Sequence, residues 1–190
     1  LPVLDLGAGT GLFATAIVSW FDTRVVAVEP SAGMRRHARQ VRAHALVAYV
    51  GGEAERLPLR DDSCAAAWLS TVIHHIGDLS GCAQELRRVL EPGGPILIRS
   101  SFPGRHARIS LFRFFPGARQ IAETFPTVEA TVAAFTTAGF DWPAGYHLVV
   151  ERYYQGLASR RPYGSSRLTM AVAGTGCGFV TARASRSRSN

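Results

Sequence analysis

Short apolar runs alternate with longer amphipathic segments along the first hundred residues. The runs are rich in β-branched residues and lie at residues 3–6, 25–28, 46–50, 65–69 and 96–98. The segments at residues 11–21, 31–45 and 79–90 have the polarity of helices, with Ser31 and Ser80 as candidate N-caps. Strands that alternate with helices of this length predict parallel βαβ units covered on both faces. We therefore expect an α/β fold with a doubly wound, mostly parallel sheet.

The pattern changes after the fifth apolar run. Residues 102–126 are aromatic and basic, and we expect them to form an insertion on the substrate side of the sheet. Residues 127–139 then predict a helix with Thr127 near its start and Gly139 at its C-terminal cap.

A further strand is expected around residues 147–152. Beyond Gly156 the chain is rich in Gly, Ser, Thr and Arg, with no hydrophobic period. We expect one domain over residues 1–156 and a poorly defined basic tail over residues 157–190, with disorder in about its last ten residues.

Composition supports a single globular domain. The chain has 190 residues, of which 47% are hydrophobic and 18% charged, and this is enough to build a core. No apolar run reaches the roughly 18 residues that a membrane span needs, and no secretory signal opens the chain, so we expect a soluble cytoplasmic protein. The cysteines Cys64, Cys82 and Cys177 are widely spaced, which predicts reduced thiols and no metal site.

The net charge of +7 is concentrated at one end of the chain. Residues 1–150 carry 14 Arg against 13 acidic residues, whereas residues 151–190 carry 7 Arg against 1. Because the body of the domain is nearly neutral, we expect no binding of nucleic acid there. No feature of the sequence indicates an oligomeric state.

The stretch LDLGAGTG combines a strand, a tight turn and a helix start. Glycines stand at Gly7, Gly9 and Gly11, and such a turn places backbone N–H groups and a helix N-terminus beside a ligand. The dinucleotide fingerprint G-x-G-x-x-G would need a glycine where Leu12 stands. Asp5 lies two residues before the first glycine, where its charge disfavours a pyrophosphate and suits a cationic ligand.

Two further acidic residues follow the next predicted strands. Glu29 ends the second strand, where a carboxylate can accept hydrogen bonds from a ribose diol. Glu53 follows the third strand, where it could reach an adenine edge, although the segment GEAER also fits a charged turn. The two acids together indicate an adenosine cofactor.

These segments resemble the class I S-adenosylmethionine-dependent methyltransferases, most closely the small-molecule group with the ubiquinone/menaquinone-biosynthesis type of methyltransferase domain. The resemblance rests on VLDLGAGTG, VVAVEPSAGM, GGEAERLPLRDDS, WLSTVIHHI and LRRVLEPGG, which occur in this order over residues 3–98. It implies a Rossmann-like seven-stranded sheet in the order 3-2-1-4-5-7-6. It also implies S-adenosyl-L-methionine as the cofactor and a small-molecule methyl acceptor. The chain has no N-P-P-Y-like motif for methylation of amino groups, so the sequence does not support a nucleic acid or a glutamine amide as the acceptor.

The resemblance assigns the cofactor contacts by motif position. It implies that the glycine loop wraps the methionine part, that one acid holds the ribose, and that later residues contact the adenine and form the floor of the site. The residues are, in that order, Gly7, Gly9 and Gly11 with Asp5 and Thr10 nearby; Glu29; Met34 on the adenine face with Glu53 and Ala54 at its edge; and Ser70. Met34 also fits a role as core filler.

His74 and His75 follow the fourth predicted strand, at the edge where an acceptor would enter. A histidine there can remove a proton from a hydroxyl, an amine or a carbon acid, so both residues are candidate general bases. The same pair is also compatible with a packing role. No other candidate nucleophile stands near the motifs, and in-line displacement of an activated methyl group requires none.

Some features depart from the family pattern. The family has a cover helix before the glycine loop, and the chain as given begins two residues before Val3, so we expect that helix to be absent from it. Ala65, Ala66 and Ala67 replace the usual D-x-V of strand four, and Pro95 stands at the start of strand five, a position that tolerates proline. Two alternatives stay open: a truncated or catalytically idle cofactor-binding module, and a nicotinamide-dependent oxidoreductase.

Overall fold

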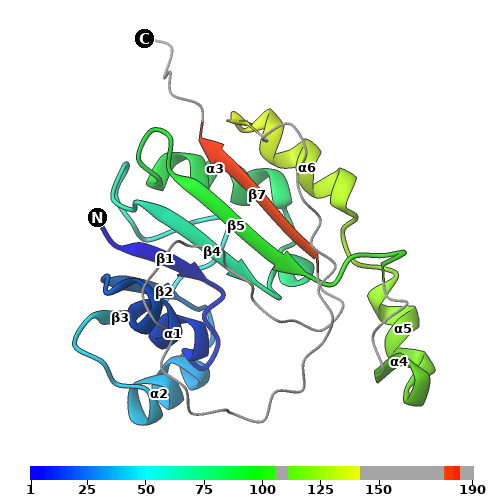
Figure 1. Cartoon of the computed structure of the whole chain (residues 1–190), viewed down its shortest axis with the longest axis horizontal. Coiled ribbons are helices and arrows are strands. Elements are labelled where there is room, and N and C mark those ends of the chain that lie inside the picture. The colour runs from blue at the N-terminus through cyan, green and yellow to red at the C-terminus, as the bar shows by residue number, and fades with distance from the viewer. Residues whose placement is uncertain (106–110, 142–177, 185–190) are drawn as a thin grey trace.

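Within the described residues, seven strands form one sheet in the order β3-β2-β1-β4-β5-β7-β6, as the resemblance implies. The computed structural model describes residues 1–105, 111–141 and 178–184 (Figure 1). The strands are β1 Val3–Leu6, β2 Val25–Val28, β3 Val47–Val50, β4 Ala66–Ser70, β5 Pro95–Ser100, β6 Phe140–Asp141 and β7 Gly178–Ala184. β1 to β5 pair in parallel, and β7 is antiparallel to both β5 and β6.

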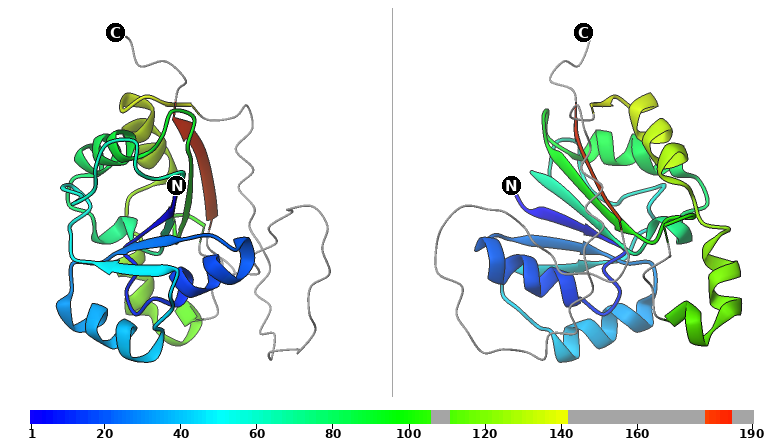
Figure 2. Two further views of the ribbon diagram at one scale, coloured as in Figure 1. Left: turned by 90° about the vertical axis from the view of Figure 1, so that its left-hand side faces the viewer. Right: turned by 45° about the vertical axis from the view of Figure 1, so that its right-hand side comes forward.

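Helices cover both faces of this sheet. They are α1 Leu12–Phe21, α2 Ala32–Val41, α3 Leu79–Val89, α4 Leu111–Phe114, α5 Pro116–Ala122 and α6 Val128–Thr137, with a short 3-10 helix, η1, at Ile73–His75. Figure 2 shows α1 and α2 on one side of the sheet and α3 and α6 on the other. The predicted doubly wound architecture is confirmed.

Alternation along the buried strands divides the core into two layers. Leu4 and Leu6 of β1 face α3 and α6, where they join a cluster with Leu86 and Phe135. Trp68 of β4 faces the other way, into a cluster with Ile17 of α1. Successive side chains of a strand point to opposite faces, so the nearly continuous apolar runs of these parallel strands supply both layers.

The predicted helix starts are right in two cases and wrong in one. Ser31 caps α2 by accepting from the Met34 N–H, and Thr127 caps α6 in the same way. The N-cap of α3 is Asp78, not Ser80. The Asp78 carboxylate accepts from the N–H groups of Ser80 and Gly81, both at 3.0 Å, and an aspartate at this place caps at least as well as a serine.

The end of the chain differs from the prediction. β7 lies at Gly178–Ala184, within the expected tail, so the expectation of disorder from residue 181 onward is wrong for residues 181–184. This strand pairs with β5 over six residues, a partner about eighty positions earlier that no local pattern reveals. The strand expected at residues 147–152 lies outside the described residues.

The expected insertion at residues 102–126 contains α4 and α5, which lie beyond the end of β5 (Figure 1). β5 begins at Pro95, the tolerated position for a proline. No helix within the described part of the chain combines the length and apolarity that crossing a membrane requires.

Candidate functional site

A cavity of about 400 Å³ opens at the carboxyl ends of the central strands. Four segments line it, following β1, β2, β3 and β4 in turn. The lining residues are Leu6, Gly7, Pro30, Gly52, Glu53, Ala54, Glu55, Val72, His75 and Ile76. β1 lies between β2 and β4, so the cavity sits where the strand order reverses, the usual ligand site of a doubly wound sheet.

The glycine loop takes a left-handed backbone at each of its glycines. The φ angles are 70° at Gly7, 56° at Gly9 and 80° at Gly11, a region that disfavours a side chain. A Cβ at Gly7 would collide with the Val72 side chain, and one at Gly11 would collide with Tyr49, whereas a Cβ at Gly9 would have no atom within 4 Å. Gly7 and Gly11 are therefore required by packing, and Gly9 borders open space.

The backbone N–H groups of this loop donate hydrogen bonds to other residues of the chain. Those of Gly7 and Ala8 donate to the Val28 carbonyl at 2.9 and 3.1 Å, and that of Gly11 donates to the Ala8 carbonyl. The Gly9 N–H donates to Glu29 Oε2 at 2.9 Å. The expectation that this loop presents its N–H groups to a ligand is wrong at these four positions, and a pyrophosphate would lack the donors it needs there.

Glu29 ties the loop to the end of β2. Its side chain is buried, and while Oε2 accepts from Gly9, Oε1 accepts from the Ser31 N–H at 2.9 Å. Each carboxylate oxygen can accept a second hydrogen bond, so both can still receive a donor from a diol. Glu29 thus holds the loop and remains a candidate ribose ligand.

Asp5 lies behind the loop, with 2% of its surface exposed. Burial raises the pKa of Asp5 to about 7; the nearby backbone N–H of Ala14 opposes this shift, and the Glu29 charge adds to it. The Oδ2 atom of Asp5 is buried and has no hydrogen-bond partner. A buried carboxylate with a free oxygen beside a second carboxylate favours a positively charged ligand. Asp5 and Glu29 therefore fit the amino and sulfonium groups of S-adenosylmethionine.

The segment after β3 supplies two carboxylates to the cavity. Glu53 and Ala54, the predicted adenine contacts, lie in its wall, and Glu55 lies beside them. Glu55 Oε1 accepts from the N–H groups of Gly77 and Asp78 at 3.1 and 3.2 Å, which joins this segment to the one after η1.

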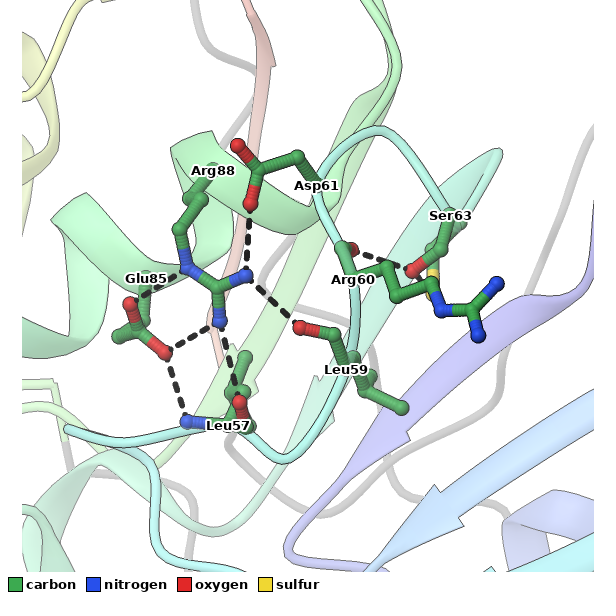
Figure 3. A network of polar contacts seen from close by, with 8 residues as sticks. Leu57, Leu59, Arg60, Asp61, Ser63, Glu85 and Arg88 are labelled. Carbon is green, nitrogen blue, oxygen red and sulfur yellow. Dashed lines mark hydrogen bonds and ion pairs between the residues drawn. The ribbon is translucent and has the colours of Figure 1, made fainter.

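A polar network on α3 holds the following part of the same segment (Figure 3). Arg88 donates to the carbonyls of Leu57 and Leu59, and it pairs with Glu85 at 2.8 Å and Asp61 at 2.9 Å. Glu85 also accepts from the Leu57 N–H at 2.7 Å, and its hydrogen bonds with Arg88 lower its pKa. The residues just after Glu53–Glu55 are therefore anchored to a rigid helix.

The two candidate histidines face different surroundings. His75 lines the cavity. His74 stacks on Phe125 of the 102–126 insertion, with ring centres 4.3 Å apart and planes 14° from parallel. Burial, followed by the neighbouring His75, lowers the pKa of His74. Only His75 of the pair is placed to meet a ligand in this cavity.

Seven of the ten predicted cofactor residues do not line the cavity, namely Asp5, Gly9, Thr10, Gly11, Glu29, Met34 and Ser70. Three of these seven are neither buried acids nor loop glycines. Met34 is 47% exposed on α2. Ser70 Oγ accepts from Arg99 at 3.1 Å, and the Thr10 carbonyl accepts from Arg42 at 3.2 Å. Their cofactor roles stay predictions.

Several lining residues were not predicted from the sequence. Glu55 stands two residues after Glu53 in an exposed-looking charged stretch, and the alternation of acids in GGEAER could have indicated it. Pro30, Val72 and Ile76 are apolar and carry no chemical motif, so their place follows only from the fold.

No cluster of metal ligands is found in the described ranges. Cys64 and Cys82 are buried and free, as expected, while Cys177 lies outside these ranges. Burial raises the pKa of the Cys82 thiol to about 12, so it is no candidate nucleophile.

Comparison with known proteins agrees with this geometry. The family model described as "Methyltransferase domain" matches residues 4–98, half of the chain. The ubiquinone/menaquinone biosynthesis C-methyltransferase UbiE of Rubrivivax gelatinosus is 40% identical over 95 residues, which are 50% of this chain and 37% of that protein. The malonyl-(acyl-carrier protein) O-methyltransferase of Erwinia pyrifoliae is 33% identical over 117 residues, 58% of this chain and 41% of that protein.

The fold extends beyond the matched half. The structure of an S-adenosylmethionine dependent methyltransferase from Mesorhizobium loti superposes with a TM-score of 0.67 at 20% identity, covering 96% of this chain and 90% of that one. At this identity the likeness shows the fold alone. The chain spans less than half the length of the two relatives it matches by sequence.

Proposed function

Because the chain belongs to the methyltransferase domain family, we propose that it transfers a methyl group from S-adenosylmethionine to a small-molecule acceptor. The acceptor atom forms a bond to the methyl carbon as the bond from that carbon to sulfur breaks, and S-adenosylhomocysteine leaves. When bound, S-adenosylmethionine supplies a methyl group activated by its positively charged sulfur.

One observation carries the choice of ligand. The N–H groups of Gly7, Ala8, Gly9 and Gly11 are all engaged within the chain, while Asp5 lies behind them with an unpartnered oxygen. A phosphate group at this loop would lie near carboxylates and would lack free N–H donors. A cationic nucleoside finds two buried acids, so the same site favours S-adenosylmethionine over a nicotinamide dinucleotide.

The remaining residues bind, orient and exclude water. In this proposal Glu29 accepts hydrogen bonds from the ribose hydroxyls, and Glu53 and Ala54 contact the adenine base. A preformed cavity aligns acceptor and methyl group, and alignment alone supplies roughly 7 kcal/mol of the barrier in favourable cases. His75 is the candidate to take the acceptor's proton, because it borders the cavity whereas His74 stacks on the insertion.

The relatives indicate two acceptor classes. One acts on ubiquinone and menaquinone precursors as a C-methyltransferase, and the other methylates an oxygen of a malonyl group on a carrier protein. Both acceptors must lose a proton or already carry a nucleophilic oxygen. C-methylation needs a base such as a histidine at the cavity edge, whereas methylation of a carboxylate oxygen does not. Whether activity requires His75 therefore distinguishes the two acceptor classes.

Release of S-adenosylhomocysteine tests the proposal. The chain is incubated with S-adenosylmethionine and either a reduced quinone lacking the ring methyl group or a malonyl thioester, and the product is measured by mass spectrometry. We expect one of the two to raise the product above the acceptor-free control. Cofactor binding without product from either acceptor would instead support the idle-module alternative.

A further inference from the structure

Thr71 has an unusual backbone for its residue type. It follows β4 directly and has φ = 58°, in the left-handed region. Asp22 and Asp62 also have positive φ, but aspartate tolerates this region far better than a β-branched residue does. Such strain lowers the population of the conformation by roughly 5- to 150-fold, so it persists only where the surroundings hold it.

Arg99 of β5 contacts this turn through both its backbone and its side chain. Its carbonyl accepts from the Thr71 N–H at 2.7 Å, which continues the ladder between β4 and β5. Its Nη1 donates to Thr71 Oγ1 at 3.2 Å and to Ser70 Oγ at 3.1 Å. The guanidinium carbon lies 5.8 Å from the ring centre of Phe13, near the start of α1. Arg99 thus joins the turn to the helix that follows the glycine loop.

The turn at Thr71 positions one wall of the cavity. Val72 comes next, and its side chain occupies the place that a Cβ at Gly7 would need. The Val72 carbonyl accepts from the His75 N–H at 2.8 Å, and Val72, His75 and Ile76 all line the cavity. If φ of Thr71 relaxed to the extended region, the chain would leave β4 in another direction and this wall would move.

We propose that Arg99 is a positioning residue, whose guanidinium holds the strained turn at Thr71 and thereby fixes the cavity wall formed by Val72, His75 and Ile76. The inference deepens the proposed function, and it rests on that function only for the use of S-adenosylhomocysteine as a probe.

A rescue experiment separates positioning from direct ligand contact. Arg99→Met removes the guanidinium hydrogen bonds, and Thr71→Gly removes the strain, since glycine adopts positive φ freely. Hydrogen exchange of the His75 amide reports on the wall without any ligand, and calorimetry with S-adenosylhomocysteine reports on the site. Arg36→Met, at an exposed arginine of α2, is the control.

We expect Arg99→Met to speed exchange of the His75 amide about tenfold and to weaken binding about tenfold, as the lower end of the strain range would produce. The double variant with Thr71→Gly should return to within about twofold of the parent in both measurements. Normal exchange in Arg99→Met, or a double variant as impaired as the single one, would overturn the proposal. Failure of the parent chain to bind S-adenosylhomocysteine would count against the proposed function, while the exchange data would still decide the role of Arg99.

If Arg99→Met does not fold, the exposed Thr71 carries the same test. Thr71→Val keeps the β-branch without the hydroxyl, so it should speed exchange of the His75 amide. Thr71→Asn tolerates positive φ and should leave exchange as in the parent chain. Equal exchange in both variants would refute the role of the strained turn.

Discussion

Replacing Asp5 by asparagine should stabilise the protein at high pH while weakening its site. The pKa of Asp5 in the folded chain is about 7, against 3.8 for an ordinary aspartate. Because the folded state holds this proton more tightly than the unfolded state, Asp5 contributes full stability below about pH 4 and loses it as the pH rises to 7. The difference of about 3 pKa units corresponds to about 4 kcal/mol.

Asp5→Asn removes this ionisation and places a neutral amide in the same space. The new N–H donor finds no acceptor in place of the unpartnered Oδ2, which costs about 1–3 kcal/mol at every pH. The variant should therefore be less stable than the parent at pH 4 and more stable at pH 8. Between pH 4 and pH 8 the difference in unfolding free energy between variant and parent should change by about 4 kcal/mol, whatever the cost of burying the amide.

Urea unfolding of both proteins from pH 4 to 8, followed by circular dichroism, measures this difference. Asp22→Asn alters an exposed carboxylate and serves as the control, since asparagine also tolerates the positive φ found at residue 22. A stability difference between Asp5→Asn and the parent that stays constant with pH would show that Asp5 is already ionised in the folded chain at low pH, and the argument would fail.

The same substitution should impair binding despite the gain in stability. Loss of the buried charge is expected to weaken S-adenosylmethionine about tenfold at pH 8, a cost typical of a hydrogen bond to a charged group. Affinity of the parent should rise as the pH passes 7 and Asp5 loses its proton, whereas the affinity of Asp5→Asn should lack this rise. Calorimetry at pH 6 and 8 measures both.

Three other substitutions or deletions test the loop, the network and the sheet. Gly9→Ala should lower the free energy of unfolding by about 1 kcal/mol, because of the positive φ at this position, and should abolish binding of S-adenosylhomocysteine. Gly7→Ala should lower it by several kcal/mol, because the new Cβ collides with the Val72 side chain. Thermal unfolding and calorimetry on both variants distinguish packing from ligand contact. Arg88→Met should destabilise by about 2–4 kcal/mol, since it leaves the carbonyls of Leu57 and Leu59 without this donor and removes the cation paired with the partly buried Glu85. Arg119→Met at an exposed pair should change stability by under about 1 kcal/mol, and equal effects of the two variants in urea unfolding would contradict the network. Deleting residues 178–190 should lower the melting temperature by exposing the β5 edge, and an unchanged melting temperature would argue against β7.

Local patterns predicted most of the fold, because the central parallel strands are apolar runs that are largely buried. The runs at residues 25–28 and 96–98 match β2 and the centre of β5, and Ser31 caps its helix as the pattern indicates. β7 was missed because it is stabilised by pairing with β5, a partner distant in sequence, and residues 178–184 carry no strong strand pattern of their own.

The site was predicted in outline and differs in detail. Of the predicted site residues, Gly7, Glu53, Ala54 and His75 line the cavity, while the other predicted cofactor residues are outside its lining. The donor groups of the glycine loop could not be assigned from sequence, since their use depends on where neighbouring strands end. The role of Arg99 was invisible for the same reason, because it pairs across the sheet with the end of β4.

Calorimetric titration of the chain with S-adenosylhomocysteine, beside an identical titration with NADH, shows directly which cofactor class the site binds. The geometry of Asp5, Glu29 and the glycine loop predicts binding of one S-adenosylhomocysteine per chain, weaker binding by Glu29→Gln, and no heat from NADH. Binding of NADH in preference to S-adenosylhomocysteine, or affinity for S-adenosylhomocysteine that Glu29→Gln leaves unchanged, would contradict the account.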